Sequence, residues 1–235
     1  MIKEKEEMVG LFHLIYVDEV ESTNTYLKDN YHLYQDYTVL IARNQTNGRG
    51  RYNRVWISED DICFSILFKK PLEHALVAPL AIVNALEKYN CNVEIKWPND
   101  IYLNQKKLSG ILIEDLYEEQ YKASIVGIGM NRTDKPAFNA IGLDPYIHAS
   151  SEEIIKSILR EYELLLMQSR QTILSAYKEH SMVLGKRVMY QGCEYTVMTI
   201  TDDGNLVLLG LDQKLKTICS DEINIKEAII EEKGK

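Results

Sequence analysis

Four arginines, two glycines and a tryptophan lie within fifteen residues, at positions 42–56 of the chain. They are Arg43, Gly48, Arg49, Gly50, Arg51, Arg54 and Trp56. Arginine forks bind phosphate or carboxylate oxygens in a bidentate way, glycines let the backbone approach a ligand closely, and an indole offers a flat face to a planar ring. The segment therefore predicts a loop that closes over a phosphorylated, ring-bearing ligand. Taken alone, it is equally typical of a solvated turn or of a non-specific contact with nucleic acid.

Other polar residues with chemical potential stand where predicted strands end. Ser22 and Thr23 lie at a strand-to-helix junction, where their hydroxyls can cap the helix or hold a polar ligand. Residues 97–100, Trp-Pro-Asn-Asp, interrupt a strand with turn chemistry, and Lys107 directly precedes another apolar strand. Glycines at alternate positions of 123–131 indicate a close approach of backbone or ligand. The chain has neither a dinucleotide fingerprint nor a phosphate-binding P-loop, so a nucleotide would bind without those devices.

Hydrophobic periodicity places these motifs on a series of strands and helices. Strands are expected over residues 11–20, 37–43, 62–68, 93–103 (broken at the Trp-Pro-Asn-Asp turn), 108–114 and 123–131. Helices are expected over residues 26–30, from Pro79 to Tyr89, over 150–170 with a Ser150/Glu153 capping box, and over 171–180. His74, just before the second helix, is expected at the surface, and the charged segment before residue 11 is assigned no element.

After residue 184 the pattern changes to short strands separated by turns, over 186–191, 194–201, 206–211 and 215–219. Four or five short strands in about fifty residues suggest a small β-barrel appended to the main domain. The boundary is expected near Leu184 and Gly185, which divides the chain into residues 1–183 and 184–235.

Composition limits the class of protein. The chain carries a net charge of −8, from 35 acidic and 27 basic residues, which argues against a general binder of nucleic acid or membrane surfaces. Its four cysteines, Cys63, Cys91, Cys193 and Cys219, have no metal-binding spacing, so Cys63 and Cys91 are expected as buried, reduced thiols and no metal site is expected. The N-terminus lacks the apolar core of a signal peptide, and no apolar run approaches the roughly 20 residues needed to cross a bilayer, so we expect a cytoplasmic protein.

Five stretches, in this order along the chain, together resemble the biotin–protein ligases. They are Glu-Ser-Thr-Asn at 21–24, Gly-Arg-Gly-Arg-x-x-Arg-x-Trp at 48–56, Lys-Trp-Pro-Asn-Asp at 96–100, Lys-Leu-Ser-Gly-Ile-Leu at 107–112 and Gly-Ile-Gly-Met-Asn at 127–131. The resemblance runs from about Phe12 to about Ile225 and implies an α+β fold. That fold is a mixed β-sheet with flanking helices, like the catalytic domain of class II aminoacyl-tRNA synthetases, followed by a small SH3-like β-barrel. The resemblance also implies an enzyme that makes biotinyl-5′-AMP from biotin and ATP and transfers biotin to a lysine of a biotin carboxyl carrier domain.

The resemblance further assigns roles to individual residues. Biotin would be held by Ser22, Thr23, Asn24, Gln45, Gly48, Arg49, Arg51, Lys107, Gly110 and Gly127. ATP or the adenylate would be held by Arg54, Trp56, Asn99, Gly129 and Asn131. Catalysis would fall to Arg49 and Lys107 at the biotin carboxylate and the α-phosphate, to Arg51, and to Asp100 beside the acyl phosphate. Mg²⁺ is expected with ATP, although the sequence supplies no dedicated set of ligands for it.

Some members of this family carry a DNA-binding helix-turn-helix domain before the first strand. Here only about ten residues, half of them charged, precede Leu11, so no such domain and no DNA partner are expected. A membrane partner is not expected either, and whether the enzyme forms a homodimer is left open. Two alternatives remain. One is a lipoate–protein ligase, which would lack Lys-Trp-Pro-Asn-Asp and carry a different Arg/Gly motif; the other is a non-enzymatic nucleic-acid-binding module, against which the acidic charge weighs.

Overall fold

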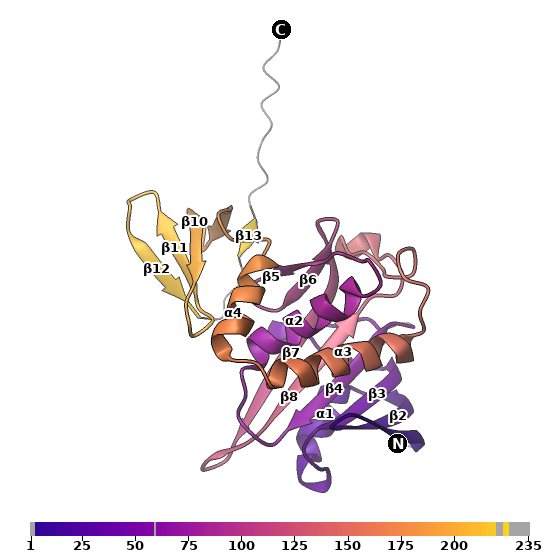
Figure 1. The fold of residues 1–235 in the computed structure, drawn as a ribbon. Helices are drawn as coiled ribbons and strands as arrows, with labels where there is room; N and C mark the ends of the chain where they lie inside the picture. The colour runs from indigo at the N-terminus through magenta and orange to yellow at the C-terminus, as the bar shows by residue number, and fades with distance from the viewer. Residues whose placement is uncertain (1–2, 59, 220–222, 226–235) are drawn as a thin grey trace.

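The computed structural model describes residues 3–58, 60–219 and 223–225 of the 235-residue chain. Its largest feature is an eight-stranded mixed β-sheet in the order β1-β2-β3-β4-β8-β7-β6-β5 (Figure 1). The strands β2 and β3 run parallel, and the other neighbouring strands are antiparallel. The strands are β1 (Lys3–Val9), β2 (Phe12–Val20), β3 (Thr38–Gln45), β4 (Ile62–Phe68), β5 (Glu94–Lys96), β6 (Asp100–Leu103), β7 (Lys106–Tyr117) and β8 (Tyr121–Met130).

Helices cover both faces of this sheet, in the expected α+β arrangement. Successive side chains of a strand point to opposite faces. In β3, Val39 and Ile41 accordingly belong to one apolar cluster, and Leu40 and Ala42 to another. A strand covered on both faces needs such a near-continuous apolar run.

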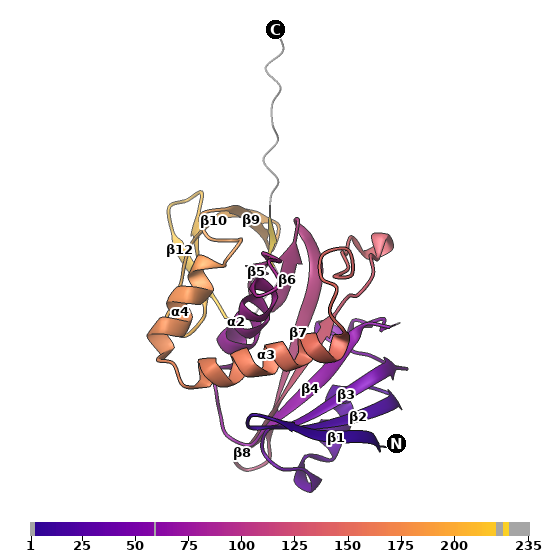
Figure 2. The same cartoon turned by 45° about the vertical axis from the view of Figure 1, so that its right-hand side comes forward.

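The two clusters are completed by different helices. The helix α1 (Thr23–Asp29) packs Leu27 into the second cluster. The first cluster is completed by α2 (His74–Glu87) and α3 (Ser151–Leu166), with α4 (Arg170–Glu179) beside α2 (Figure 2). Three short 3-10 turns, Tyr31–Leu33, Arg51–Asn53 and Pro136–Phe138, lie in the loops.

A five-stranded antiparallel sheet follows, in the order β12-β11-β10-β9-β13. Its strands are β9 (Arg187–Tyr190), β10 (Cys193–Ile200), β11 (Leu206–Gly210), β12 (Leu215–Ile218) and β13 (Asn224–Ile225). This sheet packs against the main body of the chain. The indole Nε1 of Trp97 donates to the carbonyl of Gly204 at 2.9 Å, and Val188 and Val197 belong to the same apolar cluster as α2.

The small sheet is open in the part of the chain that the structure describes. Its two end strands, β12 and β13, do not pair there, so the expected closed barrel is not seen. Residues 220–222 and 226–235 of the expected C-terminal domain lie outside the described residues. The division of the chain at residue 184 stays a prediction.

Two expectations near α2 were wrong. The helix begins at His74, not at Pro79, which lies inside it. A proline inside a helix removes one backbone hydrogen bond, but eleven of the fourteen residues of α2 are buried, and this burial outweighs the lost bond. His74 is 2% exposed rather than at the surface. Its Nδ1 lies 2.7 Å from the hydroxyl of Tyr162 and its ring packs 4.2 Å from that of Phe68, so an aromatic cluster accounts for its burial.

The charged N-terminal segment forms β1, an edge strand that sequence reasoning missed. Lys5 and Glu7 of β1 form ion pairs with Glu152 and Lys156 of α3, at 2.8 and 2.9 Å. Tyr16 of β2 donates its hydroxyl to Glu7 at 2.7 Å. The strand therefore pairs with β2 in a local hairpin, and it is also tied to α3 by charged partners 147 and 149 residues away along the chain.

The cysteines behave as expected where they are buried. Cys63 and Cys91 are buried and unpaired, and burial raises the pKa of the Cys63 thiol to about 12. Cys193 and Cys219 are exposed. In the described ranges, no helix combines the length and the apolar character needed to cross a membrane.

Candidate active site

A cavity of about 300 Å³ opens where β7 and β8 meet the loop of residues 46–58 and the start of α1. Its volume lies in the range usual for small-molecule sites. The structure brings together here every residue that the sequence assigns to the site except Gly48. Those that line the cavity are Ser22, Thr23, Asn24, Gln45, Arg49, Arg51, Arg54, Trp56, Asn99, Asp100, Lys107, Gly110, Gly127, Gly129 and Asn131.

Gly48 closes the base of loop 46–58 instead. Its carbonyl accepts a hydrogen bond from the backbone N–H of Trp56 at 2.9 Å. A Cβ placed on Gly48 would lie only 2.5 Å from the Trp56 carbonyl oxygen, so no larger residue fits between the two arms of the loop. The glycine therefore sets the path of the loop.

Glycines form the floor of the cavity. Gly110 of β7 pairs with Gly129 of β8, and the Trp56 ring lies against both, since a Cβ would stand 3.4 Å from it at Gly110 and 2.4 Å from it at Gly129. Gly127 makes room for Asn24 in the same way, because a Cβ there would stand 2.1 Å from the Asn24 amide oxygen. The alternate glycines of β8 therefore admit side chains that an ordinary strand surface would exclude.

A hydrogen-bonded polar group surrounds the start of α1. The Ser22 hydroxyl caps the helix by accepting from the backbone N–H of its third residue at 3.4 Å. Thr23 donates through its N–H and its hydroxyl to the side-chain oxygen of Gln45, at 2.8 and 3.1 Å. Ser65 of β4, fully buried, lies 2.7 Å from the Thr23 hydroxyl and 2.6 Å from the Asn24 amide oxygen. Sequence reasoning missed Ser65, whose signal was a single hydroxyl inside an otherwise apolar strand.

Arg49 is paired with a carboxylate that sequence reasoning also missed. Its NH2 donates to Glu114 of β7 at 2.8 Å, and its Nε donates to the Thr25 hydroxyl at 3.0 Å. Asn24 and Lys28 donate to the same carboxylate at 3.0 and 3.1 Å. Burial alone would raise the pKa of the Glu114 carboxyl, but these three donors together hold it below its usual value. The signal in the sequence was one carboxylate directly after an apolar run.

The second arginine of the loop docks on the turn between β5 and β6. Arg51 NH1 donates to the Asn99 side-chain oxygen at 2.9 Å, and Asn99 Nδ2 donates to the carbonyl of Ile111 at 2.8 Å. Beside them, Lys107 Nζ lies 2.6 Å from Asp100 Oδ1, and the Asp100 side chain is 19% exposed. The loop, the turn and β7 therefore meet through side-chain contacts at the cavity.

A buried ion pair, absent from the sequence expectations, ties loop 46–58 to the loop after β8. Lys135 donates to the carboxylate of Asp61 and to the carbonyl of Ile57, the latter at 2.7 Å. The other Asp61 oxygen accepts from the backbone N–H of Arg132 at 2.9 Å. The Asp61 side chain is 0% exposed, and burial raises its pKa in spite of these partners. Lys135 also lines the cavity, so this tie belongs to the site.

Comparison with known proteins identifies the class to which this fold and cavity belong. The sequence model of the Biotin/lipoate A/B protein ligase family matches residues 16–131, which carry all five motifs. The bifunctional ligase/repressor BirA of Bacillus spizizenii is 30% identical over an alignment that covers 94% of this chain and 76% of that protein. The chain therefore belongs to the biotin/lipoate A/B protein ligase family.

Two further relatives narrow the class. The biotin–[acetyl-CoA-carboxylase] ligase of Paracoccus denitrificans is 34% identical over 126 residues, which cover 48% of this chain and 52% of that protein. The solved biotin protein ligase of Aquifex aeolicus, in complex with biotin and ATP, matches with a TM-score of 0.76 at 28% identity and covers 91% of this chain and 98% of that one. Within the family the chain thus groups with the biotin–protein ligases, while its alignment spans about half the length of the Paracoccus protein.

Proposed function

We propose that this chain is an ATP-dependent ligase that activates biotin as biotinyl-5′-AMP and transfers it to a lysine of a biotin carboxyl carrier domain. The observation that carries the proposal is the one cavity that gathers residues of all five motifs. The solved relative that holds biotin and ATP supports the two substrates, and the name of the Paracoccus relative supports a carboxylase as the source of the acceptor. We further propose that residues 1–183 form the catalytic domain and residues 184–235 a small SH3-like β-domain.

The polar group at the start of α1 suits the ureido ring of biotin. Ser22, Thr23 and Gln45 line the cavity with hydroxyl and amide groups, and Ser65 holds Asn24 in place beside them. A site built to hydrogen-bond a polar ring rejects analogues without such groups, since its own buried polar atoms would be left unpaired. The dithiolane ring of lipoate offers no such groups, which favours biotin as the substrate.

Cationic side chains surround the region where the first step would occur. In that step an oxygen of the biotin carboxylate attacks the α-phosphorus of ATP, the bond from the α-phosphorus to the bridging oxygen breaks, and pyrophosphate leaves. Negative charge builds on the oxygens around the α-phosphorus. Arg49 and Lys107, both in the cavity wall, would stabilise this charge, because preorganised charges contribute most where charge develops. Arg51 would support them from its contact with Asn99.

The nucleotide end of the cavity would lie over the glycine floor. Trp56, which rests against Gly129, offers its ring to the adenine. Asn99 and Asn131 supply amide groups nearby, and Arg54 supplies a cation for the triphosphate. These assignments place the planar base and the phosphates on different parts of one wall.

Asp100 is suited to the transfer step. The amine of the acceptor lysine attacks the acyl carbon of the mixed anhydride, AMP leaves, and the amine must lose a proton. Asp100 is a carboxylate of the cavity wall and would accept that proton or orient the amine. Closure of loop 46–58 over the cavity would keep water away from the anhydride.

Mg²⁺ would enter this reaction as the partner of ATP. Within the described residues, no group of three His, Cys, Asp or Glu side chains could hold a metal ion. Phosphate oxygens of ATP and water molecules would therefore supply most of the ligands of Mg²⁺, as is common for this ion.

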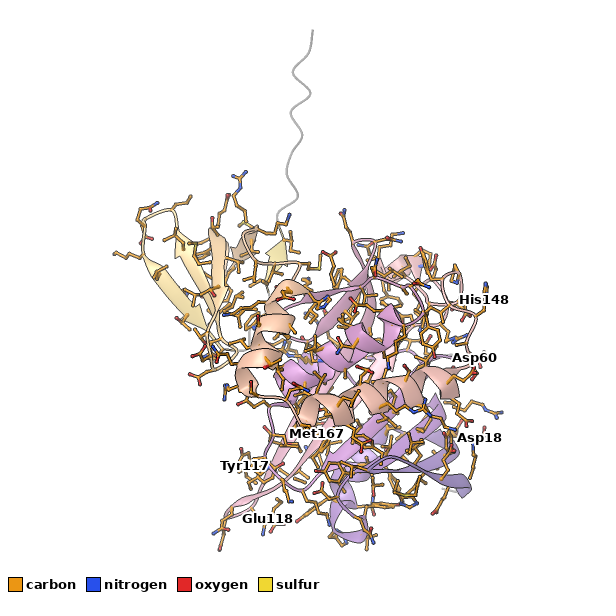
Figure 3. The ribbon with its side chains drawn as sticks, in the orientation of Figure 1. Asp18, Asp60, Tyr117, Glu118, His148 and Met167 are labelled. Carbon is orange, nitrogen blue, oxygen red and sulfur yellow. The ribbon has the colours of Figure 1, made fainter. Side chains whose placement is uncertain are left out.

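Pyrophosphate release by the purified protein tests the proposal. With MgATP present, biotin should cause release, and Arg49→Ala should lower the rate about 100–1,000-fold, the range found when one charge-stabilising donor is removed. Arg43→Ala is the matched control and should keep the rate, because Arg43 is 72% exposed and pairs with Asp18 at the edge of the molecule (Figure 3). No release with biotin, or an equal loss in both variants, would refute the proposal.

The same purified protein can be used to test the two alternative functions. Release of pyrophosphate with lipoate and not with biotin would identify a lipoate ligase. Binding of a single-stranded oligonucleotide with a steep salt dependence would favour the nucleic-acid-binding module, because phosphate contacts impose such a slope. Labelling of a carrier domain with biotin, lost when its acceptor lysine is replaced, would establish the transfer step.

A further inference from the structure

Glu114 is a carboxylate beside the cavity to which the proposed reaction gives no role. It lies on β7 and its side chain is 17% exposed. It receives donors from two other parts of the chain, Asn24 and Lys28 on α1 and Arg49 in loop 46–58. A largely buried carboxylate is costly to leave unpaired, so these four side chains hold one another in place.

The guanidinium of Arg49 is held along one edge. Its Nε donates to the Thr25 hydroxyl at 3.0 Å, and its NH2 donates to Glu114 at 2.8 Å. A guanidinium is planar and its five N–H groups point in fixed directions. With one edge bound to protein groups, the opposite edge, which includes NH1, is left for the cavity that Arg49 lines. That edge has the fork geometry that binds carboxylate or phosphate oxygens in a bidentate way.

The two oxygens of Glu114 are divided between its partners. Oε2 accepts from Asn24 and Arg49, while Oε1 accepts from Lys28, whose side chain is 40% exposed. Burial alone would raise the pKa of this carboxyl, but the three donors hold it below its usual value, so the group is charged at neutral pH. Lys28 therefore pairs with Oε1 and leaves Oε2 to hold Arg49.

We propose that Glu114 and Thr25 are positioning residues that hold the Arg49 guanidinium so that the edge that includes NH1 meets the biotin carboxylate and the α-phosphate. This inference rests on the proposed function. Without these two partners the arginine stays in the loop but its fork is free to turn. A misplacement of about 1 Å in a catalytic group can cost roughly 100-fold in rate.

A double-mutant cycle on pyrophosphate release, in the full-length protein with biotin and MgATP, tests the inference. Glu114→Gln keeps the shape of the side chain and removes its charge, and should lower kcat/KM by about 100-fold. In the Arg49→Ala background, under single-turnover conditions, the same substitution should change the rate less than about twofold, because the arginine that it positions is gone and Asn24 keeps its hydrogen bonds to Leu112 and Ser65. Glu118→Gln is the matched control and should keep the rate, since Glu118 is 62% exposed at the tip of the β7–β8 hairpin (Figure 3).

A second variant leaves the buried carboxylate untouched. Thr25→Val removes only the hydroxyl that binds Arg49 Nε, so it should lower the rate in the wild-type background and not in the Arg49→Ala background. Equal factors in both backgrounds would overturn the inference, as would a wild-type rate for both Glu114→Gln and Thr25→Val. If circular dichroism shows that Glu114→Gln does not fold, the Thr25→Val cycle decides. A wild-type protein that releases no pyrophosphate would overturn the proposed function instead, so the two failures are distinct.

Discussion

Replacing Lys135 by methionine should destabilise the protein by about 3–5 kcal/mol, the usual cost of removing one partner of a buried ion pair. The stranded group would be Asp61, whose side chain is 0% exposed, whereas Lys135 itself is 16% exposed. Asp61 would keep one partner, the N–H of Arg132 at 2.9 Å, and a single neutral donor does not balance a buried charge. For a chain of this size, such a loss corresponds to a fall of roughly 6–20 °C in Tm.

The pH dependence of this loss identifies its cause. Burial raises the pKa of Asp61 even beside Lys135, and without the ammonium the pKa should rise further. A carboxyl whose pKa is higher in the folded than in the unfolded chain costs no stability below its unfolded pKa. Its cost grows as the pH rises from the unfolded to the folded pKa and is complete above the folded pKa. The deficit of Lys135→Met should therefore be complete at about pH 8 and shrink as the pH falls toward about 4.

Urea unfolding followed by far-UV circular dichroism, at about pH 8 and about pH 5, measures these free energies. The double variant Asp61→Asn/Lys135→Met is the control, because it removes both charges: its loss should be smaller and independent of pH. A Lys135→Met loss below about 1 kcal/mol, or one that is equal at both pH values, would show that the reasoning is wrong, since a pair of that strength behaves as a solvated surface pair.

Three further predictions concern other parts of the chain. Gly129→Ala should weaken ATP binding about tenfold and leave biotin binding nearly unchanged, because its Cβ would stand 2.4 Å from the Trp56 ring, and calorimetric titration with each ligand checks this. Trp97→Phe loses a hydrogen bond to the five-stranded sheet and should lower the free energy of unfolding by about 1 kcal/mol, measured in urea. The hydrogen bond from Lys156 is the main cause of a Glu7 pKa of about 2. The stability that Glu7 contributes is therefore present above pH 4.5, the usual pKa of a glutamate, and is lost as the pH falls toward 2. Glu7→Gln should flatten this part of the curve of stability against pH.

Much of the large sheet could be predicted from local pattern. The strand expected over residues 62–68 coincides with β4, because its run of buried residues is bounded by charges at both ends. The capping box of Ser150 and Glu153 begins α3 as expected, since its hydrogen bonds join residues three apart. The strand β1 and the burial of His74 could not be predicted in this way. The ion pairs that tie β1 to α3 and the Tyr162 hydroxyl beside His74 come from residues more than 80 positions away, and no local period records such contacts.

In the candidate site, too, the residues in local motifs could be predicted, whereas their distant partners could not. The residues assigned from the motifs, except Gly48, line one cavity, although what each does with a ligand stays a prediction. Their supporting partners were missed. Ser65 and Glu114 left a local signal, because a polar group in or beside an apolar strand must be paired when it is buried. Lys135 left none, because a lysine in a loop is ordinarily solvated and only the fold shows that this one forms an ion pair with the buried Asp61.

Charge distribution separates the proposed function from the nucleic-acid-binding alternative independently of any motif. The chain carries a net charge of −8, yet five cationic side chains and one carboxylate line the cavity. They are Arg49, Arg51, Arg54, Lys107 and Lys135, with Asp100 opposite in sign. A surface that binds single-stranded nucleic acid spreads its cations along a groove, whereas these converge on about 300 Å³. Convergence focuses the field on a small anion, and biotin and ATP bring a carboxylate and a triphosphate. The net negative charge of the rest of the chain would repel a long polyanion, so the charge distribution favours a small anionic ligand over nucleic acid.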